Sequence, residues 1–426
     1  MLIAAIFIAL LLMICINVPI AVALAMCGVI GLFLTEGADS LVTIALDMYG
    51  GSTKFSLIAI PMFVLAGAIM NAGGITDRLI NFVTAIIGFI RGGLAMVNIG
   101  VSLFFAEISG SAVADVAAMG SILIPQMKKR GYSKEFSAAV TSSSASLAII
   151  IPPSIPMILY AASANTSVEQ LFVAGVVPGL IGAAGLMLVA YIFAKRYNFP
   201  TEAAFNIPRL KETFIDALPA FILPVVILGG IFGGFVTATE AAGLAVLAAI
   251  VVSAWYRNIN VAHLRRAMLD GGIQTAVVML LVAASVLMGG FLTRAQIPQH
   301  LAEGILSITT QQWAILLILN IFFLIVGFFL HSAAAIILVI PIVIPLITAA
   351  GIDPVHFGLV VTLNLAIGQQ TPPVASVLIT ACSVARANIW EVSKVNIWFV
   401  GVLLAVLMLC TYVPSVPMFL VEYFYR

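Results

Sequence analysis

The chain consists largely of apolar runs that are long enough, or nearly long enough, to cross a lipid bilayer. A helix needs about 20 predominantly apolar residues to span the hydrocarbon core. The predicted spans lie at 2–16, 19–34, 54–72, 171–194, 217–232, 240–256, 273–293 and 396–420. The first two runs could instead form one long helix that is broken at Asn17–Pro19. The sequence therefore predicts an all-α polytopic membrane protein.

Composition and charge exclude other classes of protein. Charged residues make up 8% of the 426 residues, whereas a typical soluble domain contains about 25%. So few charges could not cover a water-soluble surface. The 18 Lys and Arg nearly balance the 17 Asp and Glu, so no face can carry the basic stripe that nucleic acid binding requires. The lipid bilayer is an expected partner, and nucleic acid is not.

Basic residues indicate which side of the membrane each connection occupies. Cytoplasmic loops are enriched in Lys and Arg, and clusters of these residues lie at 128–134, 195–211 and 257–266. The segment 35–53 contains Glu36, Asp39 and Asp47 but no base, so we expect it outside. The resulting topology has ten spans, including two discontinuous helices, and places both termini outside.

Two stretches, 95–127 and 313–348, are predicted to be re-entrant hairpins. The first has basic residues at both ends, and its 33 residues are too few for two full spans and a turn. Its middle contains Glu107, Asp115 and a Ser-Gly-Ser sequence, a polar tip that must be buried in protein rather than in lipid. The alternative for this stretch is a pair of short tilted spans.

Two further stretches, 136–162 and 354–384, are predicted to be discontinuous helices. Each contains adjacent prolines, which remove backbone donors and clash with the preceding turn of a helix. In the first stretch we expect the helix to break near Ile149–Pro152 and to restart with Pro153 in its first turn. By the repeat described next, Pro373 should restart the second.

The second half of the sequence repeats the first. At an offset of 220 residues, Pro125, Gly131 and the Pro152–Pro153 pair match Pro345, Gly351 and Pro372–Pro373. An amphipathic arm precedes each hairpin, at 77–90 and 296–307, and an odd number of crossings separates the repeats, so they are inverted. The predicted division is N-terminal spans 1–53, first repeat 54–194, linking region 195–272, second repeat 273–420 and tail 421–426. Inverted repeats with paired discontinuous helices are typical of secondary transporters.

Five motifs resemble the large membrane subunit of tripartite ATP-independent periplasmic (TRAP) transporters, and the resemblance extends over essentially the whole chain. They are ISGSAVADVAAMG (108–120), IIPPSIPMILY (150–160), LFVAGVVPG (171–179), PVVILGGIFGGFVTATEAAG (224–243) and TPPVASVLI (371–379). The resemblance implies a sodium-driven importer of organic acids, such as sialic acid or C4-dicarboxylates, in the bacterial inner membrane. It also implies an elevator mechanism and two partners, a small four-helix membrane subunit and a periplasmic substrate-binding protein.

Oxygen atoms at the hairpin tips and helix breaks are the candidate ligands for at least two Na⁺ ions, because unwound carbonyls bind Na⁺ without burying a fixed charge. The first predicted site comprises Ser109, Gly110, Ser111, Ser144, Ile150, Pro152 and Ser154. The second comprises Gly327, His331, Ser332, Gly368, Thr371 and Pro372. At His331 similar chains often carry an acidic residue. The alternative is that these hydroxyls only satisfy helix backbones and pack helices closely.

The substrate is expected where the restarting half-helices direct their positive ends toward a carboxylate. The predicted contacts are Ser154, Asn364, Gln369, Gln370 and Thr371. The intramembrane carboxylates Glu107 and Asp115 have either a functional role or a structural role at the first hairpin tip. Glu240 is expected to begin a helix that Thr237 or Thr239 caps.

Other functions fit the sequence less well. There is no G-x-S-x-G motif of a serine hydrolase and no nucleotide-binding P-loop, so the chain is not expected to be an enzyme. A stand-alone sodium/anion symporter of similar hairpin architecture, which needs no binding protein, remains the alternative function.

Overall fold

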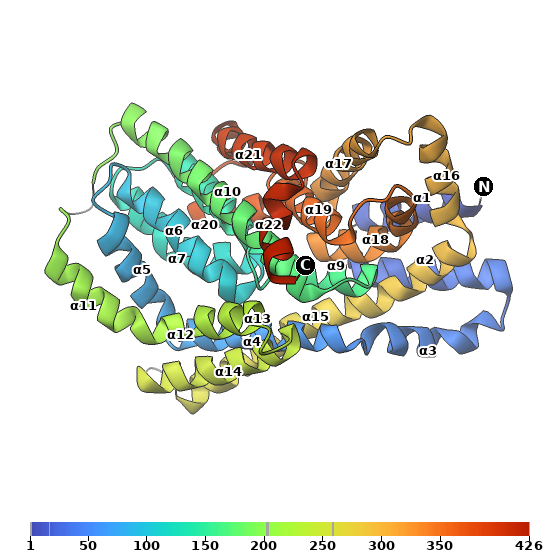
Figure 1. Ribbon diagram of the computed structural model, residues 1–426, viewed down its shortest axis with the longest axis horizontal. Coiled ribbons are helices and arrows are strands. Elements are labelled where there is room, and N and C mark those ends of the chain that lie inside the picture. The colour runs from blue at the N-terminus through green and yellow to red at the C-terminus, as the bar shows by residue number, and fades with distance from the viewer. Residues whose placement is uncertain (1, 17, 202–203, 258–259, 426) are drawn as a thin grey trace.

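A computed structural model of the chain describes residues 2–16, 18–201, 204–257 and 260–425, apart from the side chains of residues 2–4, 11, 14–15, 107–109 and 263. These residues form helices joined by short turns, with no strand in the described ranges (Figure 1). Eight helical stretches among them are long and apolar enough to cross a membrane. The prediction of an all-α polytopic membrane protein is therefore confirmed.

The two halves contain the same series of elements. The first series is η1 (Phe55–Ile58), α4 (Ala59–Ala72), α5 (Ile75–Ile87), α6 (Gly93–Ser109), α7 (Ala112–Lys129), α8 (Lys134–Ala145), η2 (Ser146–Ile149), α9 (Ile155–Ala164) and α10 (Val168–Arg196). The second is α15 (Val261–Arg294), α16 (Ile297–Ile308), α17 (Gln312–Phe329), α18 (Ser332–Ala349), α19 (Pro354–Gly368), α20 (Ser376–Ala385) and α21 (Ile389–Tyr412). Each series is a span, an arm, a hairpin, a broken helix and a span.

Backbone conformation repeats between the halves at the same turns. Gly74 before α5 and Gln296 before α16 are both left-handed. Gly131 and Gly351, which follow the two hairpins, are also left-handed, with φ of 87° and 67°. The left-handed region disfavours residues with a Cβ, yet Gln296 adopts nearly the same backbone conformation as Gly74.

The two repeats are inverted relative to each other. The first hairpin, α6 and α7, lies toward one end of the long axis of the molecule, and the second, α17 and α18, lies toward the other (Figure 1). The arms α5 and α16 also lie at opposite ends. The hairpins therefore enter from opposite sides and approach each other near the centre.

Both discontinuous helices are present, but they restart later than the sequence predicts. The helix α9 begins at Ile155, with Ser154 as its N-cap and Pro156 in its first turn, so Pro153 is not its first-turn proline. The Ser154 Oγ accepts the backbone N–H of Met157 at 3.4 Å and donates to the Ile149 carbonyl at 2.7 Å. Because this hydroxyl bridges the break, the helix starts after it. In the second half α20 begins at Ser376, so Pro373 does not restart that helix either.

The linking region folds as a bent span followed by a capped one. Its elements are α11 (Ile207–Ala217), η3 (Leu218–Phe221), α12 (Ile222–Pro224), η4 (Val225–Gly229), α13 (Gly230–Phe232) and α14 (Ala238–Trp255). Thr237 caps α14, and Glu240 returns a hydrogen bond to the Thr237 N–H at 2.8 Å. This capping box confirms the predicted role of Glu240 at a helix start.

The N-terminal region contains three helices, α1 (Leu2–Cys15), α2 (Ile20–Glu36) and α3 (Ser40–Ser52). Cys27 in α2 lies against the Ile6 carbonyl in α1, with Sγ to O at 3.9 Å, so α2 folds back along α1. The alternative of one long broken helix is therefore wrong, although Asn17 itself lies outside the described residues. The segment 35–53 was not predicted to be helical, and most of it forms α3.

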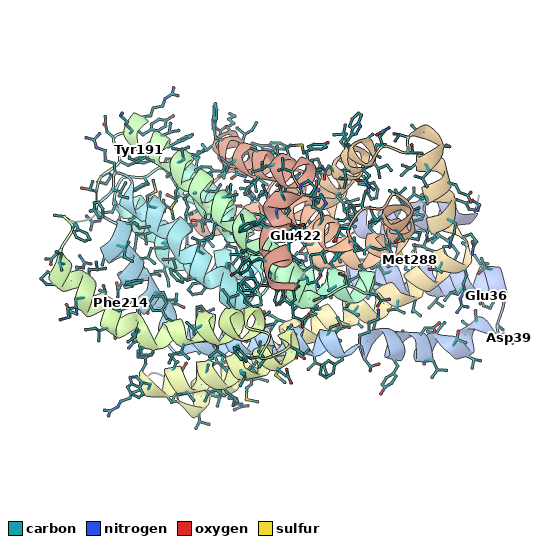
Figure 2. All side chains as sticks on the ribbon, in the orientation of Figure 1. Glu36, Asp39, Tyr191, Phe214, Met288 and Glu422 are labelled. Atoms are coloured by element: carbon teal, nitrogen blue, oxygen red, sulfur yellow. The ribbon has the colours of Figure 1, made fainter. Side chains whose placement is uncertain are left out.

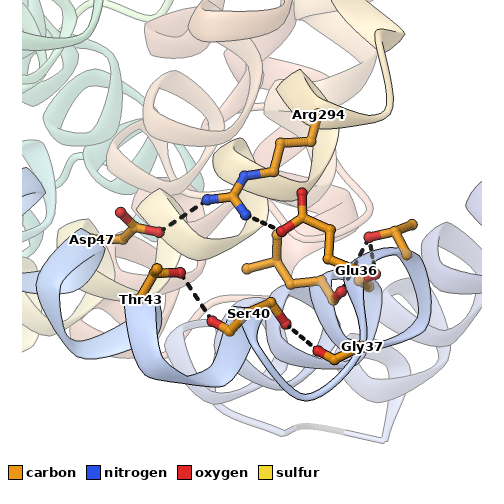
Figure 3. A network of polar contacts seen from close by, with 9 residues as sticks. Glu36, Gly37, Ser40, Thr43, Asp47 and Arg294 are labelled. Carbon is orange, nitrogen blue, oxygen red and sulfur yellow. Dashed lines mark hydrogen bonds and ion pairs between the residues drawn. The ribbon is translucent and has the colours of Figure 1, made fainter.

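Arg294 ties the end of α15 to the N-terminal helices. Its guanidinium pairs with Glu36 at the end of α2 and with Asp47 in α3, the latter at 3.5 Å (Figure 3). Figure 2 shows Glu36 and Asp39 at the end of the molecule remote from Tyr191 and Phe214. The acidic residues that are predicted to lie outside are thus gathered at one end.

The last predicted span, 396–420, is divided in the structure. The helix α21 ends at Tyr412, and α22 (Ser415–Tyr425) begins after Pro414. A proline disfavours helical backbone in the residue before it, and Val413 accordingly leaves the helix with φ −123° and ψ 75°. The crossing is therefore made by α21, with α22 as a separate short helix.

Candidate transport site

A cavity of about 620 Å³ lies between the two hairpin tips and α15. The first tip contributes Gly110 and Ser111, and the second contributes His331 and Ser332. The far wall comes from residues 273–278, in the middle part of the 34-residue helix α15. The two hairpins enter the molecule from opposite ends. Tips that line one shared cavity must therefore lie inside the molecule. This geometry fits re-entrant hairpins and not two pairs of short spans.

The first tip packs directly on the first break. Gly110 has a left-handed backbone with φ 57°, and a Cβ added there would lie 3.0 Å from the Pro153 carbonyl oxygen. Ser111 caps α7, and its Oγ accepts the Ala114 N–H at 3.5 Å. The predicted association of the tip with the break is therefore present. The side chains of Glu107 and Ser109 lie outside the described residues.

Ser144 is placed apart from the first tip. Its hydroxyl donates to Asn98 Oδ1 at 3.0 Å and to the Thr141 carbonyl at 3.2 Å. Asn98 precedes Gly110 by 12 residues in α6, which corresponds to about 18 Å along the helix axis. One ion cannot contact both the tip and Ser144, so the predicted first site does not form as a single cluster.

The remaining residues of the first half lie close to the break. Ile150 is buried, and its carbonyl oxygen faces Gly175 in α10, where an added Cβ would approach that oxygen to 2.1 Å. Pro152 forms a cis peptide bond with Pro153. Asp115 is buried in the first turn of α7, where the positive end of a helix favours a carboxylate.

The second half brings some of its predicted residues to the cavity and keeps others behind it. His331, Ser332 and Gln369 line the cavity. Behind it, Gly327 and Gly368 bring α17 and α19 into backbone contact, because a Cβ on Gly368 would lie 2.5 Å from the Gly327 Cα. Pro372 and Pro373 are joined by a cis peptide bond.

The polar residues behind the second tip make specific hydrogen bonds. Asn364 Nδ2 donates to Asn320 Oδ1 at 2.7 Å, while its buried Oδ1 has no hydrogen-bond partner among the described residues. The Thr371 hydroxyl donates to the Ile367 carbonyl at 3.0 Å. Asn396 Nδ2 donates to the Gln370 carbonyl at 3.3 Å. Asn364, Gln370 and Thr371, three of the residues predicted to contact the substrate, do not line the cavity in this conformation, and neither does Ser154.

Sequence reasoning missed a pair of repeated asparagines. Asn98 donates to Thr141 Oγ1 at 2.7 Å, and Asn320 donates to Thr411 Oγ1 at 3.1 Å. Both asparagines lie in the first helix of a hairpin and also accept a hydrogen bond from the helix that precedes a break. The signal was available, because Asn98 and Asn320 are amides in apolar runs and lie 222 residues apart, within two residues of the repeat offset of 220.

Gln274 is a second residue that sequence reasoning missed. It lies in α15 and lines the cavity opposite the tips, together with Ile273 and Val277. An amide in the wall of a membrane-embedded cavity is available to a polar ligand. The sequence could have indicated it, since Gln274 stands at the start of the apolar run 273–293.

None of the cavity-lining residues in the described part of the chain is Asp, Glu, Lys or Arg. Its polar groups are hydroxyls, amides, backbone groups and the His331 imidazole. The described residues also contain no cluster of three or more His, Cys, Asp or Glu side chains that could hold a metal ion. The site therefore offers neutral donors and acceptors to a ligand.

Comparison with known proteins identifies the family. Residues 7–416 match the tripartite ATP-independent periplasmic transporter, DctM component. The chain is 38% identical over 381 residues to the C4-dicarboxylate TRAP transporter large permease protein DctM of Pseudomonas aeruginosa, with 89% of each chain covered. It is 35% identical over 381 residues to the sialic acid TRAP transporter large permease protein SiaM of Vibrio cholerae, again with 89% of each chain covered.

A solved structure shares the fold. The YdaH transporter of Alcanivorax borkumensis, whose crystal structure has an unusual topology, superposes with a TM-score of 0.66 at 13% sequence identity, over 89% of each chain. At this identity the likeness concerns the fold alone. The family match and the two relatives, by contrast, extend over most of the sequence. The chain therefore belongs to the DctM family, the large membrane subunits of TRAP transporters.

Proposed function

We propose that this multi-pass inner-membrane protein imports an organic acid anion together with sodium, as the large subunit of a binding-protein-dependent transporter. The observation that carries the proposal is the cavity where the tips of two inverted hairpins meet α15. Secondary transporters place substrate and ion sites at the interface of such repeats. The substrate class is the one named for the two relatives, C4-dicarboxylates or sialic acid.

We place one Na⁺ between the first tip and the first break. The available oxygen ligands belong to Gly110, Ser111, Ile150, Pro152 and Ser154. Ser109 stays a candidate of this set, and Ser144 is left out because it lies with Asn98. The contact of Gly110 with the Pro153 carbonyl supports this site. A second Na⁺ would bind among Gly327, Ser332, Gly368, Thr371 and Pro372, behind the second tip.

The number of ions follows from the membrane potential. Moving one charge through 100 mV is worth about 2.3 kcal/mol. A monoanion that enters a negative-inside cell therefore needs at least two Na⁺ before the potential assists its uptake, and a dianion needs three. Two repeat-related sites are the minimum that satisfies the monoanion case.

We propose that the substrate occupies the cavity itself. Of the contacts predicted from the sequence, Gln369 lines it, and Gln274 adds an amide from the opposite wall. The other predicted contacts would support the two breaks from behind the cavity. Ser154 would support the first break, and Asn364, Gln370 and Thr371 would support the second. The absence of fixed charge among the described lining residues leaves hydroxyls, amides and backbone N–H groups to bind the carboxylate.

The proposed mechanism is an elevator. The hairpins and broken helices pack on one another, through α7 with α20 and α9 with α18, and α10 and α21 pack on the same group. A second group consists of α2, α3, α4, α14 and α15. We propose that the first group moves against the second. Because α10 and α21 pack on the first group, we include them in the moving body rather than in the scaffold.

The partners in this proposal are a small four-helix membrane subunit, which docks on the scaffold, and a periplasmic binding protein that delivers the substrate. The family to which the chain belongs is tripartite by name, which supports both partners. The alternative, a stand-alone sodium/anion symporter, differs in one respect that can be tested, because it would transport at full rate without a binding protein.

Reconstitution into liposomes tests the proposal. We expect uptake of succinate or of sialic acid to require an inward sodium gradient, the small subunit and the binding protein, and to need no ATP. Uptake that ignores sodium would contradict the coupling. Uptake at full rate by this chain alone would favour the stand-alone symporter. In the Ser111→Ala and Thr371→Ala variants, the sodium concentration for half-maximal uptake should rise, and unchanged values in both would contradict the proposed sites.

A further inference from the structure

Ser111 and His331 occupy equivalent positions, 220 residues apart, in the two hairpin tips. Each is the N-cap of the second helix of its hairpin, and each accepts a backbone N–H of that helix. Ser111 Oγ accepts the Ala114 N–H at 3.5 Å, and His331 Nδ1 accepts the Ala333 N–H at 3.4 Å. The two side chains therefore perform the same capping task with different chemical groups.

The capping bond determines which nitrogen of His331 carries the proton. Nδ1 must present its lone pair to the Ala333 N–H, so the neutral imidazole carries its hydrogen on Nε2. Nε2 is then the ring nitrogen that the capping bond leaves available to donate, and His331 lines the cavity. The second tip thus presents an N–H donor to the cavity.

An N–H donor and a hydroxyl differ in the ions that they can bind. The Ser111 oxygen has lone pairs and can contact a cation while its hydrogen points away. The Nε2–H group of His331 has no lone pair and cannot bind Na⁺, which requires oxygen ligands. It can donate to an anionic oxygen, and a hydrogen bond to a charged group is stronger than one between two neutral groups.

The rest of the cavity makes this donor more important. No Lys or Arg is found among the described residues that line it, so a carboxylate in the cavity must be held by neutral donors. The amides of Gln274 and Gln369 and the hydroxyls of Ser111 and Ser332 can each accept as readily as donate. The His331 Nε2–H group can only donate, and it therefore favours an anionic oxygen over a cation.

We infer that His331 is a specificity-determining residue that donates its Nε2–H to a carboxylate oxygen of the transported acid, and that it is not a sodium ligand. This inference rests on the proposed function, because it places the carboxylate in the cavity between the tips. The two repeats then have different roles, because the first tip faces an ion and the second tip faces the substrate.

Two variants of similar side-chain length test the inference. His331→Gln retains an N–H donor at about the same distance from the backbone, and His331→Met removes it. Uptake is measured with the complete transport system in cells, with succinate and sialic acid as the probes. The control is Thr348→Val, which removes a hydroxyl that only bonds within α18, to the Ile344 carbonyl.

We expect His331→Met to raise the substrate concentration for half-maximal uptake by about tenfold or more, as one lost hydrogen bond to a charged group requires. His331→Gln should stay within about threefold of the wild type, a difference below 1 kcal/mol. The sodium concentration for half-maximal uptake, measured at saturating substrate, should change in neither variant. Size-exclusion profiles and thermal midpoints of the purified proteins show whether each variant folds.

Three results would overturn the inference. One is a shift in sodium dependence with unchanged substrate dependence, which would return His331 to the ion site. Another is equal impairment of the Gln and Met variants, which would show that the donor is not what matters. The third is a Met variant with the substrate dependence of the wild type, which would show that His331 does not donate to the acid. A wild type that takes up acid without sodium would contradict the proposed coupling, and the Gln–Met difference would still be measurable.

Discussion

The first hairpin tip ends in Ser111 and the second in His331, although the two tips have the same backbone plan and meet in the same cavity. Behind them the same contrast recurs. Ser144 meets Asn98 in the first half, and Asn364 meets Asn320 in the second. The backbone of the repeat is thus conserved between the halves while the side chains at equivalent positions differ. This difference indicates that the two halves share a fold but have different roles in transport.

A pair of glycines behind the second tip has no counterpart in the first half. Gly327 and Gly368 bring α17 and α19 into backbone contact. The residues 220 positions earlier are Glu107 and Ala148, so the first half cannot make the same contact. The second hairpin therefore lies closer to its broken helix than side chains would otherwise allow.

The largest expected effect comes from filling this contact. In Gly368→Ala the new Cβ would lie 2.5 Å from the Gly327 Cα and 2.6 Å from its carbonyl carbon, so one helix must shift. We expect a loss of about 1–3 kcal/mol of stability from overpacking and a loss of most uptake. Thermal unfolding of the purified protein and uptake in cells measure the two effects. The control is Gly401→Ala in α21, which meets no atom within 4 Å and should behave as the wild type.

The next effect distinguishes the two asparagines. Asn320→Leu removes the acceptor of one Asn364 Nδ2 hydrogen, and that buried N–H is left without its acceptor. The other Nδ2 hydrogen keeps the Val360 carbonyl, and the Thr411 hydroxyl keeps the Leu407 carbonyl. In Asn98→Leu, Ser144 and Thr141 keep backbone acceptors in α8, the carbonyls of Thr141 and Ser137. Leaving buried polar groups unsatisfied costs about 1–3 kcal/mol, so Asn320→Leu should lower the thermal midpoint more. Equal midpoints in the two variants would show that the networks are energetically alike.

A smaller effect is expected at Gln274, on the wall that faces both tips. Gln274→Leu removes the amide from the cavity and should raise the substrate concentration for half-maximal uptake by about three- to tenfold, as loss of one neutral hydrogen bond implies. Ile273→Leu, a neighbouring and apolar cavity residue, is the matched control. If both variants transport normally, the substrate does not contact this part of α15.

The smallest effect is expected at Arg294, which precedes the left-handed Gln296 by two residues, as Ala72 precedes the left-handed Gly74 in the first half. Arg294 pairs with Glu36 and Asp47, and all three side chains are more than a third exposed. Exposed ion pairs contribute about 0–1 kcal/mol. Arg294→Ala should therefore lower the thermal midpoint by only a few degrees and leave the substrate dependence of uptake unchanged. A large loss of stability would mean that this network holds α3 in place.

The sequence predicted those features that backbone chemistry dictates. The proline pairs indicated both breaks. The proline and glycine matches indicated the repeat, and the matched Gly131 and Gly351 are both left-handed in the structure. It did not predict where the helices restart. The start of α9 depends on the hydrogen bond from Ser154 to the Ile149 carbonyl across the break, and the path of the backbone through the break is defined only in the folded protein. It also missed α3, whose sequence has no long apolar run.

The candidate site was predictable in outline and not in detail. Proximity of the tips followed from the inverted repeat, and Ser111, His331 and Gln369 do share a cavity. The separation of Ser144 from the tip depends on which face of α8 meets Asn98, and Gln274 enters the site from a helix outside both hairpins. Such relations arise from packing between segments far apart in the sequence. The sodium ligands and the division into domains stay predictions.

The central claim is that two hairpins, which enter from opposite sides of the membrane, place their tips in one cavity. Single cysteines at Val113 and Ala333, each in a chain whose four native cysteines are replaced, test it directly. A membrane-impermeant maleimide is applied to right-side-out and to inside-out vesicles. The account predicts that both tips react with the same side preference and that both are protected by sodium with substrate. Labelling of the two tips from opposite sides only would show two pairs of spans and contradict the account.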